Sequence, residues 1–346
     1  MGLWKRRISW GWIGLVAGIL FFTEPAHGVT KAGTSAAQFL KIAVGPRAAA
    51  LAGSFSAIAN DASALYWNPA GIAWMPRGSI LATHTDWFLD IQHDFFGLVV
   101  PISTASRLGF SFTTLNTSDM EQTTIEEPEG NGIYFDVQDI AVGISFSRMM
   151  TNRFSFGITV KYIQQTLFNE SAHTVAVDLG GMLKTGFKGM KLGMSMSNFG
   201  GKMKLDGRDL IVSYDPSPGQ TGNPLVPSRM ETESWHLPSN FRIGLALDVV
   251  GAREGLFVQP GQRLTISVDG NNFNDSPENL SFGMEYAWNE MFFLRGGYKL
   301  NHDLESFSAG LGFQLPFQRW KIQADYAMTG MSNLGMVQRI GLGIGF

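Results

Sequence analysis

The stretch MVQRIGLGIGF, residues 336–346, decides the fold. Successive side chains of a β-strand point to opposite faces. The stretch therefore has one apolar face (Ile340, Leu342, Ile344, Phe346) and one face of small or charged residues (Arg339, Gly341, Gly343, Gly345). Strands of transmembrane barrels alternate in this way. Because the sequence ends inside this strand, we expect it to pair with the first strand of a closed barrel, since closure leaves no unpaired backbone edge in lipid.

The same alternation recurs along most of the chain. Phe154 and Phe156, for example, share one face of a segment whose other face carries Ser155 and Gly157. Segments of this kind have about the 9 to 11 residues that a tilted strand needs to cross a bilayer. Fourteen are predicted, starting near Gly78, Gln92, Ser106, Val137, Arg153, Ala172, Gly189, Ser239, Gln262, Glu278, Glu290, Glu305, Arg319 and Met336. The sequence therefore predicts an all-β fold: a closed antiparallel transmembrane β-barrel of about 14 strands.

The connections between these segments support the prediction. Short turns and longer loops alternate in a bacterial barrel, and here brief turns are predicted near 101–105 and 149–152, with longer loops at 118–136 and 200–238. Residues 250–261 are too long for the short turn expected there. The alternation is also poor in the first two predicted strands.

Composition fits a barrel better than a soluble domain. Charged residues are 16% of the chain, against about 25% in soluble domains. The hydrophobic residues, 45% of the chain, are dispersed singly rather than gathered in helical spans after residue 28. The absence of cysteine excludes disulfides and thiolate metal sites. A net charge of −3 is too small to indicate a nucleic-acid partner.

The first residues have the features of a secretory signal peptide. Three basic residues (Lys5, Arg6, Arg7) precede an apolar run at 8–22, and Ala26 and Gly28 supply small residues before a cleavage point. The alternative is an uncleaved anchor, although the run is shorter than the ~20 residues of a spanning helix. We therefore expect a signal peptide at 1–28, an N-terminal hatch or plug at 29–77 and an outer-membrane barrel at 78–346.

The predicted plug follows from the size of the barrel. Side chains alone fill a barrel of about eight strands, so a larger one needs other material in its lumen. Residues 29–77 are rich in Ala, Gly and Ser and suit close packing against the wall. A short helix is expected to begin at Asn60 or Asp61, whose side chains can cap it, and to run to Tyr66. Asn68 and Pro69 should end it.

Charged residues of both signs recur on the face expected to point inward. A pore selective for ions carries rings of one sign, so the mixture indicates ion pairs in a filled lumen. The basic residues are Lys161, Arg242, Arg263, Arg295, Lys321 and Arg339, and the acidic ones are Asp178, Asp248, Asp269, Glu285 and Asp325.

The predicted outer loops hold the candidate partner-binding residues. No basic residue lies between Arg107 and Arg148, whereas acidic residues, including Glu126, Glu127 and Glu129, are frequent there. They form either an acidic docking surface or a solvated loop. Four aromatic residues are either partner anchors or members of an interfacial aromatic belt: Trp87, Phe88, Tyr214 and Trp235.

Signals of catalysis are thin. The six histidines are scattered without metal-ligand spacing, and no Gly-x-Ser-x-Gly nucleophile motif occurs. We expect no enzyme, no cofactor and no metal site. An outer-membrane lipid hydrolase is an alternative that no motif supports.

Several stretches resemble a known family. Residues 33–41 (GTSAAQFLK), 45–54 (GPRAAALAGS) and 59–71 (ANDASALYWNPAG) resemble the amino-terminal signature of PorV/PorQ-type proteins, relatives of the FadL fatty-acid transporter. Residues 235–244 resemble a second block of that family. The resemblance implies a fourteen-stranded barrel, and it assigns a hatch motif to Asp61, Trp67, Asn68, Pro69, Ala70 and Gly71. The chain's end resembles the β-signal read by the barrel-assembly machinery, carried here by Arg339, Gly341, Ile344 and Phe346.

The resemblance leaves two functions open. The first is a component of type IX protein secretion that binds a SprA-type translocon or the signal domains of secreted cargo through outer loops. The alternative is a FadL-like transporter of hydrophobic compounds. Both imply residence in the bacterial outer membrane after signal-peptide cleavage, with membrane lipids and the assembly machinery as partners.

Overall fold

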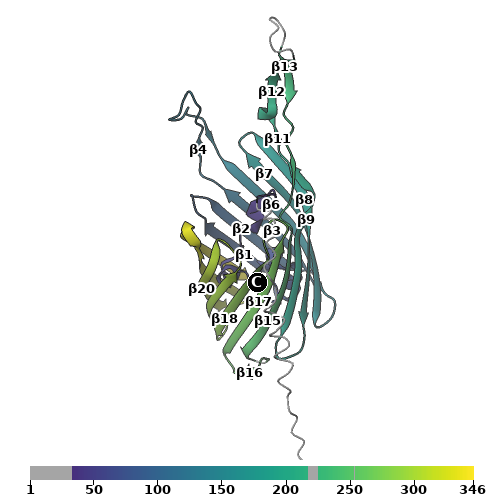
Figure 1. Cartoon of the computed structure of the whole chain (residues 1–346). Helices are drawn as coiled ribbons and strands as arrows, with labels where there is room; N and C mark the ends of the chain where they lie inside the picture. Colours follow the sequence, from purple (N-terminus) through teal and green to yellow (C-terminus); the bar gives the residue numbers. More distant parts are fainter. Residues whose placement is uncertain (1–32, 217–224, 253) are drawn as a thin grey trace, which may run out of the picture.

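The computed structural model describes residues 33–216, 225–252 and 254–346, so the predicted signal peptide lies outside the described residues. Fourteen long strands form a ring (Figure 1). In chain order they are β1 (Ser79–Asp86), β2 (Gln92–Pro101), β3 (Ser106–Asn116), β6 (Val137–Met149), β7 (Phe154–Leu167), β8 (Glu170–Lys184), β9 (Lys191–Gly200), β15 (Asn240–Gly251), β17 (Gln262–Phe273), β18 (Asn279–Trp288), β19 (Phe292–Leu300), β20 (Glu305–Phe317), β21 (Trp320–Met331) and β22 (Met336–Gly345).

The ring is closed by its first and last strands. β1 pairs antiparallel with β22, from Ser79 opposite Gly345 to Asp86 opposite Gln338. Each of the other long strands also pairs antiparallel with its two neighbours, including β9 with β15 across the longest loop. The predicted closed antiparallel barrel of 14 strands is therefore confirmed, and every predicted strand start lies within two residues of the observed one.

The two irregular places in the prediction have physical explanations. β1 and β2 alternate poorly because polar residues (His84, Asp86, Asp94) stand on their outward face near one end of the barrel. The long connection after β15 contains β16 (Phe257–Val258), which pairs parallel with β15 and so lies against the barrel wall.

The two longest connections, after β3 and after β9, lie at the same end of the ring, and the opposite end has shorter connections. We call these ends the loop end and the turn end. The loop end carries the hairpin of β4 (Met120–Glu121) with β5 (Tyr134–Phe135), and the pair of β10 (Lys202–Lys204) with β14 (Ser234–His236). It also carries β11 (Asp206–Gly207), η3 (Arg208–Leu210), η4 (Ser332–Leu334), and the hairpin of β12 (Ile211–Tyr214) with β13 (Val226–Arg229). The β12–β13 hairpin projects well beyond the ring (Figure 1).

The outward face of the barrel carries an apolar band with a clear boundary near the loop end. Across β3, β6, β7 and β8 one row of paired outward residues is apolar: Phe112, Val142, Tyr162 and Val175. In the next row toward the loop end stand Thr114, Ile140, Gln164 and His173, of which only Ile140 is apolar. Near the turn end aromatic rings gather, including Trp288 with Phe292 at 5.7 Å and Trp320 with Phe346 at 6.2 Å. An apolar band edged by aromatic rings is typical of a membrane barrel.

The N-terminal part of the described chain lies within the ring. It contains η1 (Gln38–Lys41), α2 (Pro46–Ala50), α3 (Ala64–Trp67) and η2 (Pro69–Trp74). Inward-facing side chains on distant strands bind it: Ser155 of β7 accepts from Trp74 Nε1 at 2.8 Å, and Asp269 of β17 accepts from Ser56 N at 2.9 Å. Within the described residues, no helix is long and apolar enough to cross a membrane.

The short predicted helix is present but starts later than expected. α3 begins at Ala64, because Asp61 folds back to accept a hydrogen bond from Ser63 N at 2.9 Å and so forms a turn before the helix. The helix ends at Trp67, before Asn68 and Pro69, as the sequence predicts.

Candidate functional site: the filled lumen and its loop end

The barrel wall has glycine wherever the N-terminal segment (residues 34–77) approaches it most closely. A Cβ atom on Gly193 would lie 2.2 Å from the Ser56 carbonyl oxygen, and one on Gly297 would lie 2.3 Å from the Leu51 carbonyl carbon. Ten inward-facing glycines, each on a different strand, would place a Cβ within 2.2 to 3.1 Å of the segment: Gly97, Gly109, Gly157, Gly180, Gly193, Gly244, Gly283, Gly297, Gly310 and Gly341. Side chains cannot approach so closely without displacing their neighbours. Wall and segment are therefore complementary in shape around most of the ring.

The six residues of the predicted hatch motif join this segment to itself and to the wall. Asn68 Nδ2 donates to the Ser56 carbonyl at 2.9 Å and to the Gly181 carbonyl of β8 at 3.1 Å, while its Oδ1 accepts from Ala70 N at 3.1 Å. Pro69 begins η2, so the fixed φ of proline starts the next helical turn. Gly71 is required because a Cβ there would lie 2.0 Å from the Ala59 carbonyl oxygen.

The remaining hatch contacts also use backbone carbonyls of the segment as acceptors. Ser195 Oγ of β9 donates to the Trp67 carbonyl at 2.9 Å, and Ser155 Oγ of β7 donates to the Ala70 carbonyl at 2.9 Å. Trp67 Nε1 donates to the Val44 carbonyl at 2.8 Å within the segment. Buried backbone carbonyls need such partners, so inward-facing serines satisfy the irregular part of the segment. The motif therefore holds the segment in place.

A buried charge cluster holds the other side of the segment. The Glu285 carboxylate of β18, 1% exposed, accepts from Arg47 Nε of the segment at 2.8 Å and from Arg295 Nε at 2.8 Å. Arg263 Nη1 lies 2.8 Å from its other oxygen. Arg47 also reaches Asp61 at 3.0 Å. Burial by itself would lower the pKa of Arg47, but the Glu285 and Asp61 carboxylates raise it above its ordinary value, so the guanidinium stays charged.

The inward charges are paired only in part as predicted. Ion pairs join Lys161 to Asp178 at 2.9 Å and Arg295 to Asp325 at 2.6 Å. The prediction is wrong for Arg242, Lys321 and Arg339, which have no carboxylate at ion-pair distance within the described residues. Aromatic rings stand beside the two arginines instead: Trp67 lies 4.9 Å from the Arg242 guanidinium and Trp87 lies 5.5 Å from that of Arg339.

Asp269 is a further exception among the inward charges. This carboxylate accepts from Ser56 N at 2.9 Å and from Ser54 Oγ at 3.2 Å. Its partners are therefore in the N-terminal segment, which alternation along the strands cannot reveal.

A polar vestibule of about 350 Å³ opens above the segment at the loop end. It is lined by parts of η1 and of the loops 274–278 and 301–304. Lys41 and Gln38 of η1 both reach the Asp275 carboxylate, at 2.9 and 2.7 Å. Burial would raise the pKa of Asp275, but hydrogen bonds from Gln38 and Lys41 lower it below its ordinary value. The vestibule floor is thus tied to a loop by a charge-assisted contact.

Two apolar grooves lie on the outward face of the wall. One, of about 980 Å³, is bordered by rings and aliphatic side chains of β18 to β22, including Trp288, Phe292, Leu311, Ala324 and Leu342. The other, of about 560 Å³, runs over β7 to β9 and β15. Both grooves can accept hydrocarbon.

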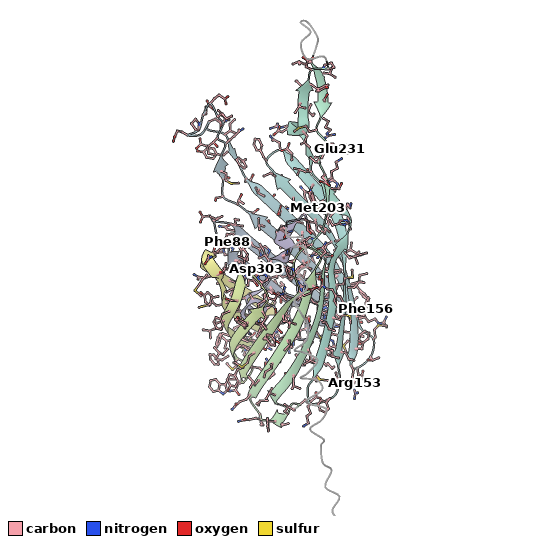
Figure 2. The ribbon with its side chains drawn as sticks, viewed as in Figure 1. Phe88, Arg153, Phe156, Met203, Glu231 and Asp303 are labelled. Atoms are coloured by element: carbon pink, nitrogen blue, oxygen red, sulfur yellow. The ribbon has the colours of Figure 1, made fainter. Side chains whose placement is uncertain are left out.

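The predicted partner-binding residues do not form one site. Trp87 is half-buried against Phe88, with ring centroids 5.2 Å apart. Glu126, Glu127 and Glu129 are exposed between β4 and β5, Tyr214 is 56% exposed on β12, and Trp235 is 42% exposed opposite Met203 of β10. Figure 2 draws Phe88, Met203 and Glu231 toward the loop end and Arg153 toward the other end.

The residues of the predicted assembly signal lie in the seam between β1 and β22. Gly341 pairs with Thr83 and Ile344 with Ile80. Phe346 N donates to the Gly78 carbonyl at 2.9 Å, and the Phe346 ring fills the space where a Gly78 side chain would stand. Sequence reasoning placed Gly157 and Gly341 on the non-apolar face but missed the close contacts that Gly78 and the ten inward glycines make. Their signal was the glycine content of 41 residues, about 12% of the chain against a usual ~7%.

Comparison with known proteins places the fold. No curated protein matches the chain. Among solved structures, it is similar to the toluene transporter TodX of Pseudomonas putida (TM-score 0.54, 14% identity, covering 87% of this chain and 97% of that one). It is also similar to the toluene transporter TbuX of Ralstonia pickettii (0.54, 11%, 87% and 97%) and to a FadL homologue of Pseudomonas aeruginosa (0.52, 13%, 88% and 98%).

These similarities show a FadL-type barrel fold. A family model described as an uncharacterised protein family matches residues 24–207, which is more than half of the chain. That match includes the N-terminal segment and the barrel strands β1 to β9. The chain therefore belongs to the uncharacterised protein family UPF0164.

Proposed function

We propose that the protein is an outer-membrane transporter of hydrophobic compounds in which residues 34–77 act as a hatch. The observation that carries this proposal is a 14-strand barrel whose lumen is occupied by its own N-terminal segment, in the fold of the toluene transporters TodX and TbuX. The proposed substrates are small apolar molecules, in line with the toluene transporters whose fold the chain shares.

The proposed orientation places the loop end outside the cell. Bacterial barrels have short turns on the periplasmic side and longer loops outside. Here β1 begins and β22 ends at the turn end. The outward apolar band then lies in the bilayer. A signal peptide at 1–28 supplies the route of export.

Transport in this proposal requires part of the segment to move away from the wall glycines that it contacts. A compound that enters the vestibule meets α2 and α3, which are almost fully buried. The axial path is therefore closed in this conformation, and any passage needs a shift of residues 45–75 or a gap between the segment and the wall.

A reversible crosslink tests the hatch. In this cysteine-free chain, Leu51→Cys with Gly283→Cys places two Cβ atoms about 3.0 Å apart, so a small shift of the segment brings them to the ~3.5 to 4.5 Å of a disulfide. We expect oxidised protein in proteoliposomes to pass toluene much more slowly than reduced protein. The matched control is Ser145→Cys with Thr159→Cys, which joins two wall strands whose side-chain oxygens are 2.7 Å apart. Equal toluene flux in all states contradicts a moving hatch, and flux no greater than in protein-free vesicles contradicts transport itself.

A second candidate function, a PorV/PorQ-like part of type IX secretion, is favoured by one observation. The β12–β13 hairpin projects from the barrel with exposed apolar side chains, among them Ile211 at 58% and Tyr214 at 56%, which suits a protein partner. In this proposal the hairpin contacts a SprA-type translocon or the signal domain of cargo. Purification from solubilised outer membranes should then recover such a partner with the full chain, and shortening the hairpin should abolish recovery. Recovery of the barrel alone contradicts this role.

A further inference from the structure

A polar crevice of about 710 Å³ lies on the outer flank of the barrel at the loop end. Ser171 and His173, which line it, share the outward face of β8 with the exposed Val175, so the crevice faces away from the lumen. Its other walls come from the loop after β9. The lining residues are Ser171, His173, Lys202, Lys204, Leu205, Asp206, Gly207, Leu210, Arg229, Met230, Glu231 and Thr232.

The height of the crevice is fixed by strand register. His173 pairs with Gln164, in the first row beyond the apolar band, while Val175 pairs with Tyr162 in the last apolar row. Val175 is 54% exposed and Phe199 is 64% exposed. The crevice therefore begins where the apolar band ends, which is the level of lipid head groups around a membrane barrel.

The lysines of β10 are held on the crevice side by their neighbour. Met203, 2% exposed, belongs to the same buried cluster as the inward-facing Ala172 and Ala176 of β8. Alternation along β10 then turns Lys202 and Lys204 away from the lumen, and both are exposed and line the crevice. The buried Met203 side chain thus fixes the direction of the two lysine side chains.

The basic groups of the crevice are only partly neutralised. Lys204 Nζ lies 3.2 Å from Glu231, and Arg229 is paired with Asp206. Lys202 has no carboxylate at ion-pair distance among the described residues. Besides Lys202, the crevice is lined by His173 and by the paired Lys204 and Arg229.

The other side of the barrel differs at the same height. There His84 contacts Asp94 at 2.6 Å and Asp86 at 3.0 Å, and the loop at 117–136 has no basic residue. Cationic side chains at head-group height therefore gather on this flank, although the chain as a whole has a net charge of −3.

We propose that this crevice binds the phosphate-bearing head group of an anionic lipid in the leaflet that surrounds the loop end. Lysine serves as a point charge for phosphate, and a head group held by Lys202 and Lys204 leaves its acyl chains against Val175 and Phe199 in the apolar band. This continuity with the band favours a lipid over free phosphate. The proposal is independent of what the barrel transports and needs only its insertion in a membrane.

Native mass spectrometry of the full-length protein in detergent tests the proposal. Dioleoylphosphatidylglycerol and dioleoylphosphatidylcholine are added in equal amounts, because both carry phosphate but only the first is anionic. We expect the wild-type protein to retain phosphatidylglycerol with about tenfold preference, and the double variant Lys202→Gln/Lys204→Gln to lose that preference.

The matched control removes two charges elsewhere. Arg208 is 74% exposed in the same loop but does not line the crevice, and Lys188 lies in a turn at the opposite end. Arg208→Gln/Lys188→Gln should keep the preference, and heat-shifted mobility in gels should show all variants folded. Equal loss of preference in the control, or no preference in the wild-type protein, would falsify the lipid site. Complete displacement of phosphatidylglycerol by excess inorganic phosphate would also overturn it, in favour of a free-anion site.

Discussion

Phe346 closes the barrel against Gly78. The Phe346 backbone N–H donates to the Gly78 carbonyl at 2.9 Å, and a Cβ on Gly78 would lie 2.4 Å from the Phe346 ring. The final aromatic residue thus completes the ladder between β1 and β22 and covers the residue that precedes β1. We therefore expect a change at either Gly78 or Phe346 to weaken the seam.

Replacing Gly78 should therefore impair assembly. We expect Gly78→Ala to lower the folded fraction of the barrel in outer membranes, because overpacking costs about 1 to 3 kcal/mol and falls on the strand pair that closes the ring. The measurement is the fraction with heat-modifiable mobility. Gly296→Ala is the matched control, since nothing lies within 4 Å of a Cβ there. Equal folded fractions for the two variants would refute the role assigned to this contact.

A methyl group at a wall glycine should destabilise the barrel through the N-terminal segment. In Gly193→Ala the new Cβ meets the Ser56 carbonyl oxygen at 2.2 Å, and backbone cannot yield as a side-chain tip does. We expect a loss of at least ~1 to 3 kcal/mol in the free energy of unfolding, measured by denaturant titration in detergent. A value as small as that of Gly296→Ala would mean that the segment is not held against β9.

Removing the central carboxylate of the charge cluster should be more costly than removing its exposed neighbour. Glu285→Gln leaves Arg47, Arg263 and Arg295 buried around a neutral group, and breaking buried pairs costs about 3 to 5 kcal/mol. Glu290, 53% exposed, pairs with Arg263 at 2.7 Å, so Glu290→Gln should cost less than ~1 kcal/mol. Denaturant titration of both variants measures the two losses in the free energy of unfolding. Similar losses would contradict the expected order.

Acid should loosen the contact between η1 and the loop at 274–278. Because Gln38 and Lys41 hold the pKa of Asp275 below its ordinary value, the stabilisation is complete above the ordinary pKa, about 3.9, and is lost as pH falls below it. We expect the melting temperature of the wild-type protein to fall between pH 6 and pH 3 by more than that of Asp275→Asn. Parallel falls in the two proteins would exclude Asp275 as a source of the pH dependence.

The strand pattern could be predicted from sequence because a membrane barrel imposes a two-residue period on every strand. The row from Phe112 to Val175 follows directly from that period. The fate of individual inward residues could not be predicted, since it depends on which part of the N-terminal segment lies opposite each one. The sequence predicts an ion pair for Asp269, but in the structure its carboxylate accepts hydrogen bonds from Ser54 and Ser56.

The loop end is predictable only in outline. Acidic and aromatic residues there signal exposed loops, but their positions depend on short strand pairs such as β10 with β14, for which three residues give no recognisable period. The basic crevice is an example. Lys202, Lys204 and Arg229 are far apart from His173 in sequence and meet only because β10 crosses the outer end of β8.

The ten inward glycines restrict how the inside of this barrel can diversify. A wall position that must be glycine has no side chain to exchange, so the shape of the interior is carried by residues 34–77. The interior shapes of relatives should therefore differ mainly in that segment and in the connections at the loop end, over a wall that stays nearly constant.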